Sequence, residues 1–594
     1  MRRAILFLFV PVLLFAQYWG ERVTEKSFEH STLYFNSFYL NPYGIHPFQK
    51  VALGLMPDPF LALHLNPAAL PTDTTLLYID FRGDRHEPAV VGYRPMNPYV
   101  DYAAYYRPSY DPRWYTVTRG EPEPVVSVGL LNRISDRFAV NFGYQFLFKE
   151  EPFYRMTFPI YYSSYGMNYR GEAIADQTSV PVIDRSAGED NMLTRAHLWM
   201  INAGFKLNPR LAFGATLSGV IHNRSGEYAR LNRSQYNTQD NDEWRNFYDK
   251  TRENDYSHLD FAAGFQYRFN QKLDFGVKIG YLRGTATQDY SVQDTSTYYW
   301  QEQNGNSTHS SYRNNRTNQH WRHKGHDTYG RISLNYQWTP KRQIAFYLRY
   351  STKTIDLSSN STIIDTSYYS GFRDDTYYYS EYLSHTRLED VRHSDGQTDV
   401  NTWQTMFTFR TRQTKRSRVR FGVYFASRDY RTTVREPAKV FSHSYYHSVY
   451  QDKPSPVKEY TDRSKLIEDK TLVWKTATRH QTLQIPVMLS YDINSSWTIL
   501  TLVNRMWDYW KVEDETTAYF KRRVQQNNDE YKEEENFGER YREPTRSITE
   551  ENTDVLFGAK LKISDQFDIN LLVNPDLGSE GLISQWWLNF RAKL

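Results

Sequence analysis

The chain has 594 residues, no cysteine and a formal net charge of +4. The lack of cysteine excludes a disulfide framework, and the near balance of 72 basic and 68 acidic residues gives no reason to expect a nucleic-acid partner. The mean hydropathy of −0.72 is typical of a water-soluble protein. It does not exclude a membrane β-barrel, because only alternate residues of a barrel strand face lipid.

The first sixteen residues have the pattern of a secretory signal peptide. Arg2 and Arg3 precede an apolar run from Ala4 to Phe15, and we expect the cut after Ala16. A membrane-anchoring helix is the alternative interpretation, but this run of about a dozen apolar residues is shorter than the ~20 that a span requires. We therefore expect an exported protein from which residues 1–16 are removed.

Residues 17–73 are apolar but are interrupted by proline. The stretches 33–45 and 51–70 are too apolar for a solvated tail and too broken for a long strand. We expect this region to fold as a hatch inside a barrel formed by residues 74–594. It is much shorter than the plug domain of a TonB-dependent transporter, whose barrel has about 22 strands.

Alternating hydrophobicity is the main signal in residues 74–594. In the clearest segment, from His258 to Phe269, every second residue from Leu259 onward is apolar. A period of two indicates an extended strand. A soluble β-sandwich also alternates, but its strands are usually about five or six residues long. Segments of the ~9 to 11 residues that a tilted span needs favour an all-β fold, an antiparallel up-and-down transmembrane β-barrel.

About sixteen such segments can be counted, with fourteen as the alternative. Very short connections rich in Asn, Asp, Pro and Ser alternate with long ones, so the short turns and both chain ends are expected in the periplasm. The last segment resembles the terminal signal read by the barrel-insertion machinery, although it ends on Leu594 rather than on an aromatic residue. The predicted strands lie near residues 74–82, 125–132, 138–149, 196–207, 211–224, 258–269, 273–287, 328–338, 343–355, 401–411, 418–432, 479–491, 496–513, 553–563, 567–573 and 583–593.

The polar faces of these segments predict a lumen with a basic bias. Two interpretations are open: the charges pair with one another and with the hatch, or they line a passage that favours anionic solutes. The residues expected to line the lumen are Lys206, Asp260, Arg268, Asp274, Lys278, Arg331, Arg349, Arg410, Arg418, Arg420 and Lys560.

A short motif in the hatch region resembles part of a known family. Asn66, Pro67 and Ala68, followed by Leu70, are similar to the Asn-Pro-Ala element of the long-chain fatty-acid transporter family of outer-membrane barrels. The resemblance implies an N-terminal hatch and the passage of hydrophobic compounds through the barrel wall. The chain departs from this family in its strand count and in its larger, more polar loops. A simple turn into the first strand is the alternative interpretation of Asn66 and Pro67.

The long connections hold tyrosine in runs. A pattern of Asp-Thr followed closely by paired tyrosines recurs at Asp294, Asp365 and Asp375. Because Tyr and Thr favour strands, the hairpins are expected to continue beyond the membrane as a β-extended crown. A stacking surface for glycans is the alternative.

Other chemistry is weakly signalled. His320, His323 and His326 could bind a transition metal only if the fold brought their imidazoles together. No nucleophile elbow, phosphate loop or zinc-protease motif is found, so no catalytic residue, cofactor or metal is assigned. We expect an outer-membrane channel or transporter for small hydrophobic or anionic molecules, with membrane lipid and the insertion machinery as partners. The alternative is a non-transporting outer-membrane scaffold or surface protein whose loops bind a protein or a glycan.

Overall fold

The structure is a computed structural model that describes most of the chain from residue 74 onward and a short part before it. The predicted signal peptide, residues 1–16, and most of the predicted hatch, residues 17–73, lie outside the described residues. Among the residues that are described, no helix combines the length and the apolar character needed to cross a membrane. The described residues are 63, 65–69, 74–84, 123–152, 179–182, 186–237, 241–302, 305–542, 545–575 and 585–594.

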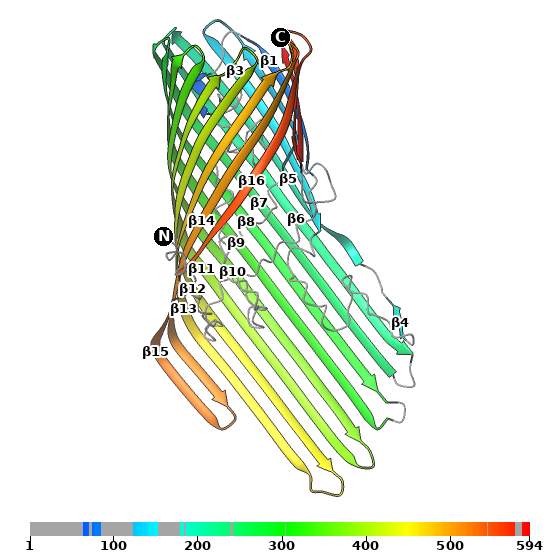
Figure 1. The fold of residues 1–594 in the computed structure, drawn as a ribbon. Helices are drawn as coiled ribbons and strands as arrows, with labels where there is room; N and C mark the ends of the chain where they lie inside the picture. Colours follow the sequence, from blue (N-terminus) through cyan, green and yellow to red (C-terminus); the bar gives the residue numbers. More distant parts are fainter. Residues whose placement is uncertain are drawn as a thin grey trace, which may run out of the picture.

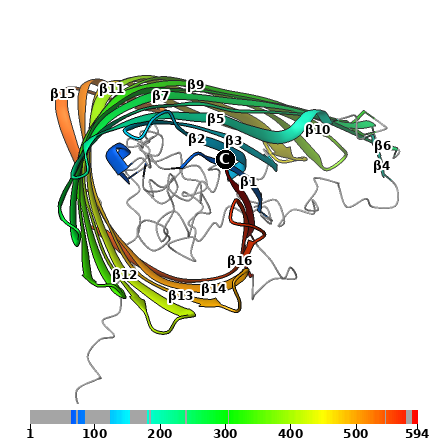
Figure 2. The same ribbon diagram turned by 90° about the horizontal axis from the view of Figure 1, so that it is seen from above.

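In the described part of the chain, eighteen strands form one antiparallel sheet that closes on itself (Figures 1 and 2). β4 and β5 lie end to end beside β6, and β15 and β16 lie end to end beside β14, so the wall has sixteen strands. The predicted barrel of about sixteen strands is confirmed, and the alternative of fourteen is wrong. The strands are β1 (Leu76–Asp84), β2 (Glu123–Arg133), β3 (Phe138–Pro152), β4 (Ser179–Val182), β5 (Ser186–Asn208), β6 (Leu211–Asn237), β7 (Asn241–Asn270), β8 (Leu273–Gln301), β9 (Ser307–Thr339), β10 (Arg342–Asp374), β11 (Tyr378–Arg412), β12 (Ser417–Asp452), β13 (Lys458–Asp492), β14 (Trp497–Asn527), β15 (Glu530–Arg542), β16 (Arg546–Lys562), β17 (Phe567–Asn574) and β18 (Gln585–Lys593).

The barrel closes between its first and last strands. β1 pairs with β18 from Leu76 opposite Lys593 to Asp84 opposite Gln585, and the other edge of β1 pairs with β2. Closure gives the strands two neighbours at this level of the barrel. The backbone N–H and C=O groups are therefore satisfied within the sheet and no edge is exposed there.

The short connections predicted from the sequence are tight turns in the structure. The Oδ1 atoms of Asn208 and Asn270 each accept a hydrogen bond of 2.8 Å from the backbone N–H two residues later. Asn494 accepts bonds from the N–H groups of Ser496 and Trp497 in the same way. Such local bonds stabilise a chain reversal, which explains why these connections are rich in Asn and Ser.

Much of the sequence predicted as long connections is strand. β9 to β13 have 33 to 36 residues each, about three times the length that a bilayer span needs. Their far halves continue away from the short turns as a curved sheet, which we call the crown (Figure 1, bottom). The predicted β-extended crown is confirmed. Within the described residues, the long connections predicted between the segments 258–269 and 496–513 are mostly strand and not loop, because polar residues there keep the strand alternation and the pairing.

The two faces of each strand differ in the half beside the short turns. Outward side chains there are large and apolar, and Phe261 and Ile279 are 57% and 61% exposed. The inner face is identified by the short helix η2 (Pro67–Ala69), which lies inside the ring of strands in Figure 2 and contacts β5, β6 and β7. Trp338 is exposed near one end of this apolar band, and Tyr350 contacts Trp403 near the other, as interfacial aromatics do.

β15 is the outermost strand on one side of the crown. Within the described residues it pairs only with β14, so one of its edges has no strand beside it. Most of its residues are charged, and four of them are Glu530, Glu533, Glu534 and Glu535. Asn536 has a positive φ of 56°, a left-handed conformation that interrupts the regular strand.

Candidate functional site

A cluster of charged side chains is buried on the inner face of β7 to β10. Asp260, Lys278, Arg331 and Arg349 are buried there together with Tyr329. The Tyr329 hydroxyl donates to the carboxylate of Asp260, with both oxygens at 3.0 Å. The Arg349 guanidinium lies 4.8 Å from the centre of this ring, and the Lys278 ammonium lies 5.7 Å from it. The structure thus brings together four of the residues predicted to line the lumen.

Strand pairing explains how the cluster forms. Lys278 lies opposite Arg331, and Arg331 lies opposite Arg349, so three cations occupy one row across β8, β9 and β10. Like charges in opposite positions repel one another, and burial adds a desolvation penalty. Asp260 and Asp327 supply opposite charge, with the Asp327 carboxylate 3.6 Å from Arg349. The result is a polar inner wall at the level of the apolar outer band.

Other predicted lumen residues lie closer to the short turns and form ion pairs there. Arg268 Nε is 2.8 Å from Asp274 Oδ1, which joins two predicted residues across the β7–β8 hairpin. Arg418 pairs with Asp492 at 2.5 Å across β12 and β13. At this rim the charges pair with one another, as the first interpretation of the sequence expects.

The remaining predicted positions also lie in the half beside the short turns. Lys560 Nζ is 2.9 Å from Asp568 across the β16–β17 hairpin. Arg410 is half-buried, with its Nη1 atom 3.5 Å from Gln343 Oε1. Arg420 is half-buried, and Lys206 is exposed beside the turn at the end of β5. These four residues are not part of the buried cluster around Tyr329.

The Asn-Pro-Ala element docks in a notch made by glycines on three adjacent strands. A Cβ atom added at Gly214 of β6 would lie 2.3 Å from the carbonyl carbon of Pro67. One added at Gly264 of β7 would lie 2.2 Å from Asn66 Oδ1, and one at Gly276 of β8 would lie 2.7 Å from Asn66 Nδ2. Only glycine leaves room for the element at these positions, because real Cβ atoms do not approach so closely.

Hydrogen bonds hold the element in the notch. Asn66 Nδ2 donates to the carbonyl oxygen of Phe265 at 2.9 Å, and Asn66 Oδ1 accepts the N–H of Ala68 at 3.0 Å. Arg331 Nη1 donates to the carbonyl oxygen of Leu65 at 3.3 Å. Asn66 therefore stabilises a local turn and attaches that turn to the wall, and Arg331 links it to the buried charged cluster.

An apolar row crosses the inner face between the buried charged cluster around Tyr329 and the crown. Strand pairing aligns Trp474, Val434, Gly396 and Leu357 on β13, β12, β11 and β10. This level was not covered by the prediction of a polar lumen with a basic bias, because its inward positions lie mostly in stretches predicted as connections. The buried apolar cluster that contains this row consists of Ala196, Leu198, Met200, Val220, Tyr256, Leu282, Ala286, Ile355, Leu357, Val434, Leu472, Trp474, Ala518 and Phe520.

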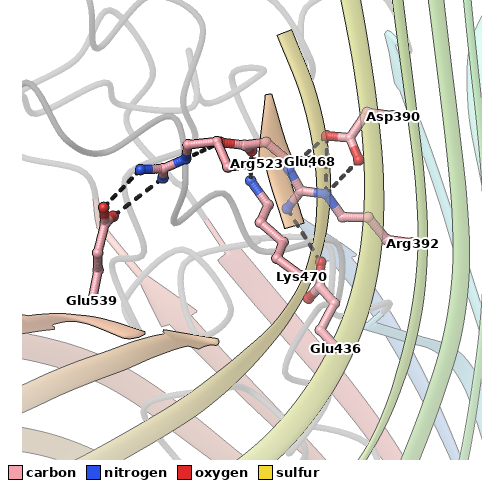
Figure 3. A network of polar contacts seen from close by, with 7 residues as sticks. All are labelled: Asp390, Arg392, Glu436, Glu468, Lys470, Arg523 and Glu539. Atoms are coloured by element: carbon pink, nitrogen blue, oxygen red, sulfur yellow. Dashed lines mark hydrogen bonds and ion pairs between the residues drawn. The ribbon is translucent and has the colours of Figure 1, made fainter. Parts of the chain in front are cut away.

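A network of ion pairs lies beside the apolar row, at the base of the crown (Figure 3). Arg392 donates to Asp390 at 2.6 Å and to Glu436 at 3.1 Å. The indole N–H of Trp474 donates to the other carboxylate oxygen of Glu436 at 3.0 Å. All four side chains are buried, and Glu436 is fully so. Buried charges of this kind are stable only when they are paired and hydrogen-bonded.

The network continues to β15 through Arg523. Its guanidinium donates to Glu468 at 3.0 Å and makes two bonds to Glu539, at 2.8 and 3.3 Å. Lys470 Nζ is 2.5 Å from the other oxygen of Glu468. The guanidinium of Arg523 also lies 3.9 Å from the centre of the Phe520 ring. Together these ion pairs line β11 to β15 where the crown begins, which fits a structural role.

None of these network residues was predicted from the sequence. Arg392, Glu436 and Lys470 lie in stretches predicted as long connections, where apolar alternation fades. A usable signal was present nonetheless, because the inward phase of a strand continues in steps of two. Counting back from Met406 in steps of two reaches Arg392, and counting forward from Tyr424 reaches Glu436.

The three histidines considered as metal ligands do not converge. His323 is buried on the inner face of β9, whereas His320 and His326 lie on its other face because their positions differ by odd numbers. His320 Nδ1 instead lies 2.6 Å from Asp289. Within the described part of the chain, no group of three His, Cys, Asp or Glu residues is placed to hold a metal ion.

Comparisons with known proteins do not assign a family. No family model and no curated protein matches the chain. Among solved structures, the Pseudomonas putida toluene transporter TodX is 10% identical, with a TM-score of 0.28 over 90% of this chain and 91% of that one. The monoaromatic hydrocarbon channel CymD is 11% identical, with a TM-score of 0.25 over 67% and 82%. The ferric-catecholate import receptor Fiu from E. coli K12 is 6% identical, with a TM-score of 0.25 over 88% and 82%.

Proposed function

We propose that the protein is an outer-membrane channel or transporter for small molecules. The observation that supports this most directly is the pairing of an apolar outer face with a charged inner face on the same strands. Ile279 points outward beside Lys278, which points inward. A ring of exposed apolar side chains is unfavourable in water but becomes the contact surface in a bilayer. The short turns then lie in the periplasm, and the crown lies outside the cell.

The buried cluster on β7 to β10 is the proposed selectivity element. Lys278, Arg331 and Arg349 contribute three positive charges to one row of the inner wall, beside the carboxylates of Asp260 and Asp327. A wall with this charge pattern attracts small anions more strongly than small cations. Water-filled passages select by such side chains, and no catalytic step is involved.

The proposal includes a hatch formed by residues 17–73. Its support is the docking of Asn66, Pro67 and Ala68 in the glycine notch, together with the bond from Arg331 to the Leu65 carbonyl. The Asn-Pro-Ala element resembles that of the long-chain fatty-acid transporter family, in which a hatch is expected. We propose that the notch anchors the C-terminal end of the hatch to the wall, next to the charged cluster.

Planar-bilayer recordings test the channel proposal and the hatch proposal separately. The wild-type protein is compared with a variant that lacks residues 17–70. We expect conductance to rise on deletion, because the lumen loses its hatch, and the reversal potential in a salt gradient to show a preference for anions. No conductance and no solute uptake by either protein would contradict the channel and favour a non-transporting scaffold. High conductance of both proteins would contradict only the hatch.

Hydrophobic compounds are a second candidate class of solute. The specific observation that favours them is the buried apolar row on the inner face, which includes Leu357, Val434 and Trp474. Mass spectrometry of organic extracts of the purified protein tests this alternative. Hydrophobic molecules that co-purify with the wild type, and are lost when Asn66 and Pro67 are replaced by alanine, would support it. Extracts that contain only detergent and membrane lipid would argue against it.

A further inference from the structure

The inner face of the crown carries two rows of aromatic side chains that the channel proposal does not use. They lie on β8 to β13, in the far ends of the strands at the bottom of Figure 1. In the first row, aromatic residues alternate with small or polar ones. In the second row they alternate from His309 onward, out of phase with the first row, and Trp300 precedes His309. One row consists of Tyr298, Ser311, Tyr369, Ser384, Tyr446 and Asp462. The other, nearer the tip, consists of Trp300, His309, Gly371, Tyr382, Ser448 and Tyr460.

Rings of the two rows contact one another. The ring centres of His309 and Tyr369 are 4.4 Å apart, and those of Tyr369 and Tyr382 are 5.1 Å apart in a stacked arrangement. Tyr298 lies 5.3 Å from His309. A Cβ atom added at Gly371 would lie 2.1 Å from Tyr382 Cζ, so the Tyr382 ring lies over the one position that has no side chain. The rings therefore form an ordered surface rather than scattered side chains.

A row of hydroxyl groups borders the aromatic rows on the side of the membrane. The hydroxyls of Ser367 and Thr386 lie 2.5 Å apart, and those of Ser444 and Ser464 lie 2.8 Å apart. Ser296 and Arg313 complete this row on β8 and β9. The surface thus offers hydrogen-bond donors and acceptors next to flat apolar rings. We call the aromatic rows and this hydroxyl row together the crown platform.

Acidic groups lie at the edges of the crown platform. Arg313 pairs with Asp365 at 2.9 Å. Asp294 lies in the same inner-face row as Asp365, because both residues are opposite Asn315 of β9. Burial raises the pKa of the Asp294 carboxyl above its usual range, while Arg313 acts in the opposite direction. With Asp462 on β13, the platform and its border hold three carboxyl groups and one guanidinium. This charge pattern does not match a polyanion such as a nucleic acid.

A repeated sequence produces this arrangement twice. Residues 294–298 read Asp-Thr-Ser-Thr-Tyr, and residues 365–369 read Asp-Thr-Ser-Tyr-Tyr. Because alternate strand residues share a face, each repeat places an aspartate, a serine and a tyrosine on the inner face in the same order. The first repeat lies on β8 and the second on β10, in register across β9.

The crown platform is open to solvent. Tyr369, Tyr446 and Tyr460 are 41%, 38% and 52% exposed. Six strands at the usual spacing span roughly 24 Å across the platform, enough for several sugar rings in a line. Aromatic rings and hydroxyl groups at this density provide both kinds of contact that a pyranose ring makes, through its C–H face and its hydroxyls.

We propose that the crown platform binds a neutral oligosaccharide. Ring faces such as that of Tyr369 stack on the C–H faces of the sugars, and the serine hydroxyls and the Asp462 carboxylate bond to the sugar hydroxyls. A purely apolar ligand would desolvate these polar groups without replacing their hydrogen bonds, which is unfavourable. The site goes beyond the proposed channel, because it binds sugar whether or not the barrel conducts.

Isothermal titration of the full-length protein in detergent micelles tests this proposal. The probes are linear hexasaccharides of β-1,4-linked glucose, xylose and mannose. We expect at least one of them to bind the wild type. Replacing Tyr369 or Tyr446 with alanine is expected to weaken binding on the order of ten-fold, because each variant removes one stacking ring.

The chain offers matched controls on the opposite face. Tyr368 and Tyr445 are the sequence neighbours of Tyr369 and Tyr446 and lie on the outer face of the same strands. Tyr368→Ala and Tyr445→Ala are expected to leave affinity unchanged. Tyr369→Phe keeps the ring and removes only its hydroxyl, so it is expected to retain most of the affinity. Heat-modifiable gel mobility confirms that each variant forms a closed barrel.

Three results would overturn the proposal. The first is no binding of any of the three hexasaccharides to the wild type at millimolar concentration. The second is an equal loss of affinity in the inner-face and outer-face alanine variants. The third is that the wild type binds dextran sulfate or toluene but none of the neutral hexasaccharides, and that Tyr369→Ala abolishes this binding. None of these measurements depends on conductance, so they leave the channel proposal to its own test.

Discussion

The same strands form two regions, the crown and the half of the barrel that lies beside the short turns. The faces of these strands differ between the two regions in polarity. On β8, Ile279 points outward in an apolar band and Lys278 points inward, whereas Tyr298 and Ser296 occupy the inner face farther along. The backbone pairing continues without a break between the two regions. The comparison shows that backbone hydrogen bonding sets the geometry of the sheet. The side chains determine whether a given part of the sheet is stable in contact with lipid or with water.

The junction between the two regions carries the largest expected effect. Replacing Glu436 with leucine removes the partner of Arg392 and of the Trp474 indole, and leaves both groups buried without it. We expect the free energy of unfolding to fall by about 3–5 kcal/mol, as for other broken buried ion pairs. Urea unfolding in micelles, followed by tryptophan fluorescence, measures the change.

An exposed pair serves as the control for this prediction. Arg479 and Asp429 are 2.7 Å apart but lie on the surface of the sheet. Asp429→Asn is expected to leave the unfolding midpoint unchanged, because water screens such pairs. If Glu436→Leu were as stable as Asp429→Asn, the network in Figure 3 would not hold the crown to the barrel.

A charge placed on the outer face distinguishes the two regions directly. Ile279→Arg puts a cation in the apolar band and is expected to cost about 2–4 kcal/mol in lipid. Tyr312→Arg puts the same cation on the outer face of the crown on β9, where a change within about 0.5 kcal/mol is expected. Folding titrations in lipid vesicles measure both. Equal costs would mean that the band around Ile279 does not contact lipid.

The notch gives the smallest change in stability but a specific change in function. Gly264→Val places side-chain atoms where Asn66 lies and is expected to cost about 1–3 kcal/mol by overpacking. We also expect higher conductance in planar bilayers, because the Asn-Pro-Ala element can no longer dock in the glycine notch. Gly330→Val is the control, since a Cβ atom at Gly330 meets nothing within 4 Å. Unchanged conductance of Gly264→Val would contradict a role for the notch in closing the lumen.

The same comparison explains which parts of the fold could be predicted. Beside the short turns, outward residues such as Phe261 must be apolar, so the period of two is visible and all sixteen strands could be located from the sequence. In the crown neither face is uniformly apolar, and a strand such as residues 356–374 of β10 differs little in composition from a loop. The tyrosine and threonine content of this segment still indicated strands. It predicted that the hairpins extend as a crown, but it did not predict how long the crown is.

The candidate site was predictable to a similar degree. The inward phase of the visible strands predicted Asp260, Lys278, Arg331 and Arg349 as lumen residues, and the structure places these four buried side chains in one cluster. It did not identify Tyr329, which orders the cluster, because an aromatic residue on the inner face has the same appearance as one facing lipid. The glycine notch could not be predicted from the sequence either. Gly214, Gly264 and Gly276 come together only through the register of three strands, and a lone sequence does not fix that register.

The charged outer strand of the crown has a consequence for crowded membranes. A long sheet that stands free in solution offers its last strand as a template on which a neighbouring molecule could add its own. On β15 the glutamates repel an identical partner, and the kink at Asn536 spoils the straight line that such an addition needs. This edge of the crown is therefore poorly suited to strand addition by an adjacent copy.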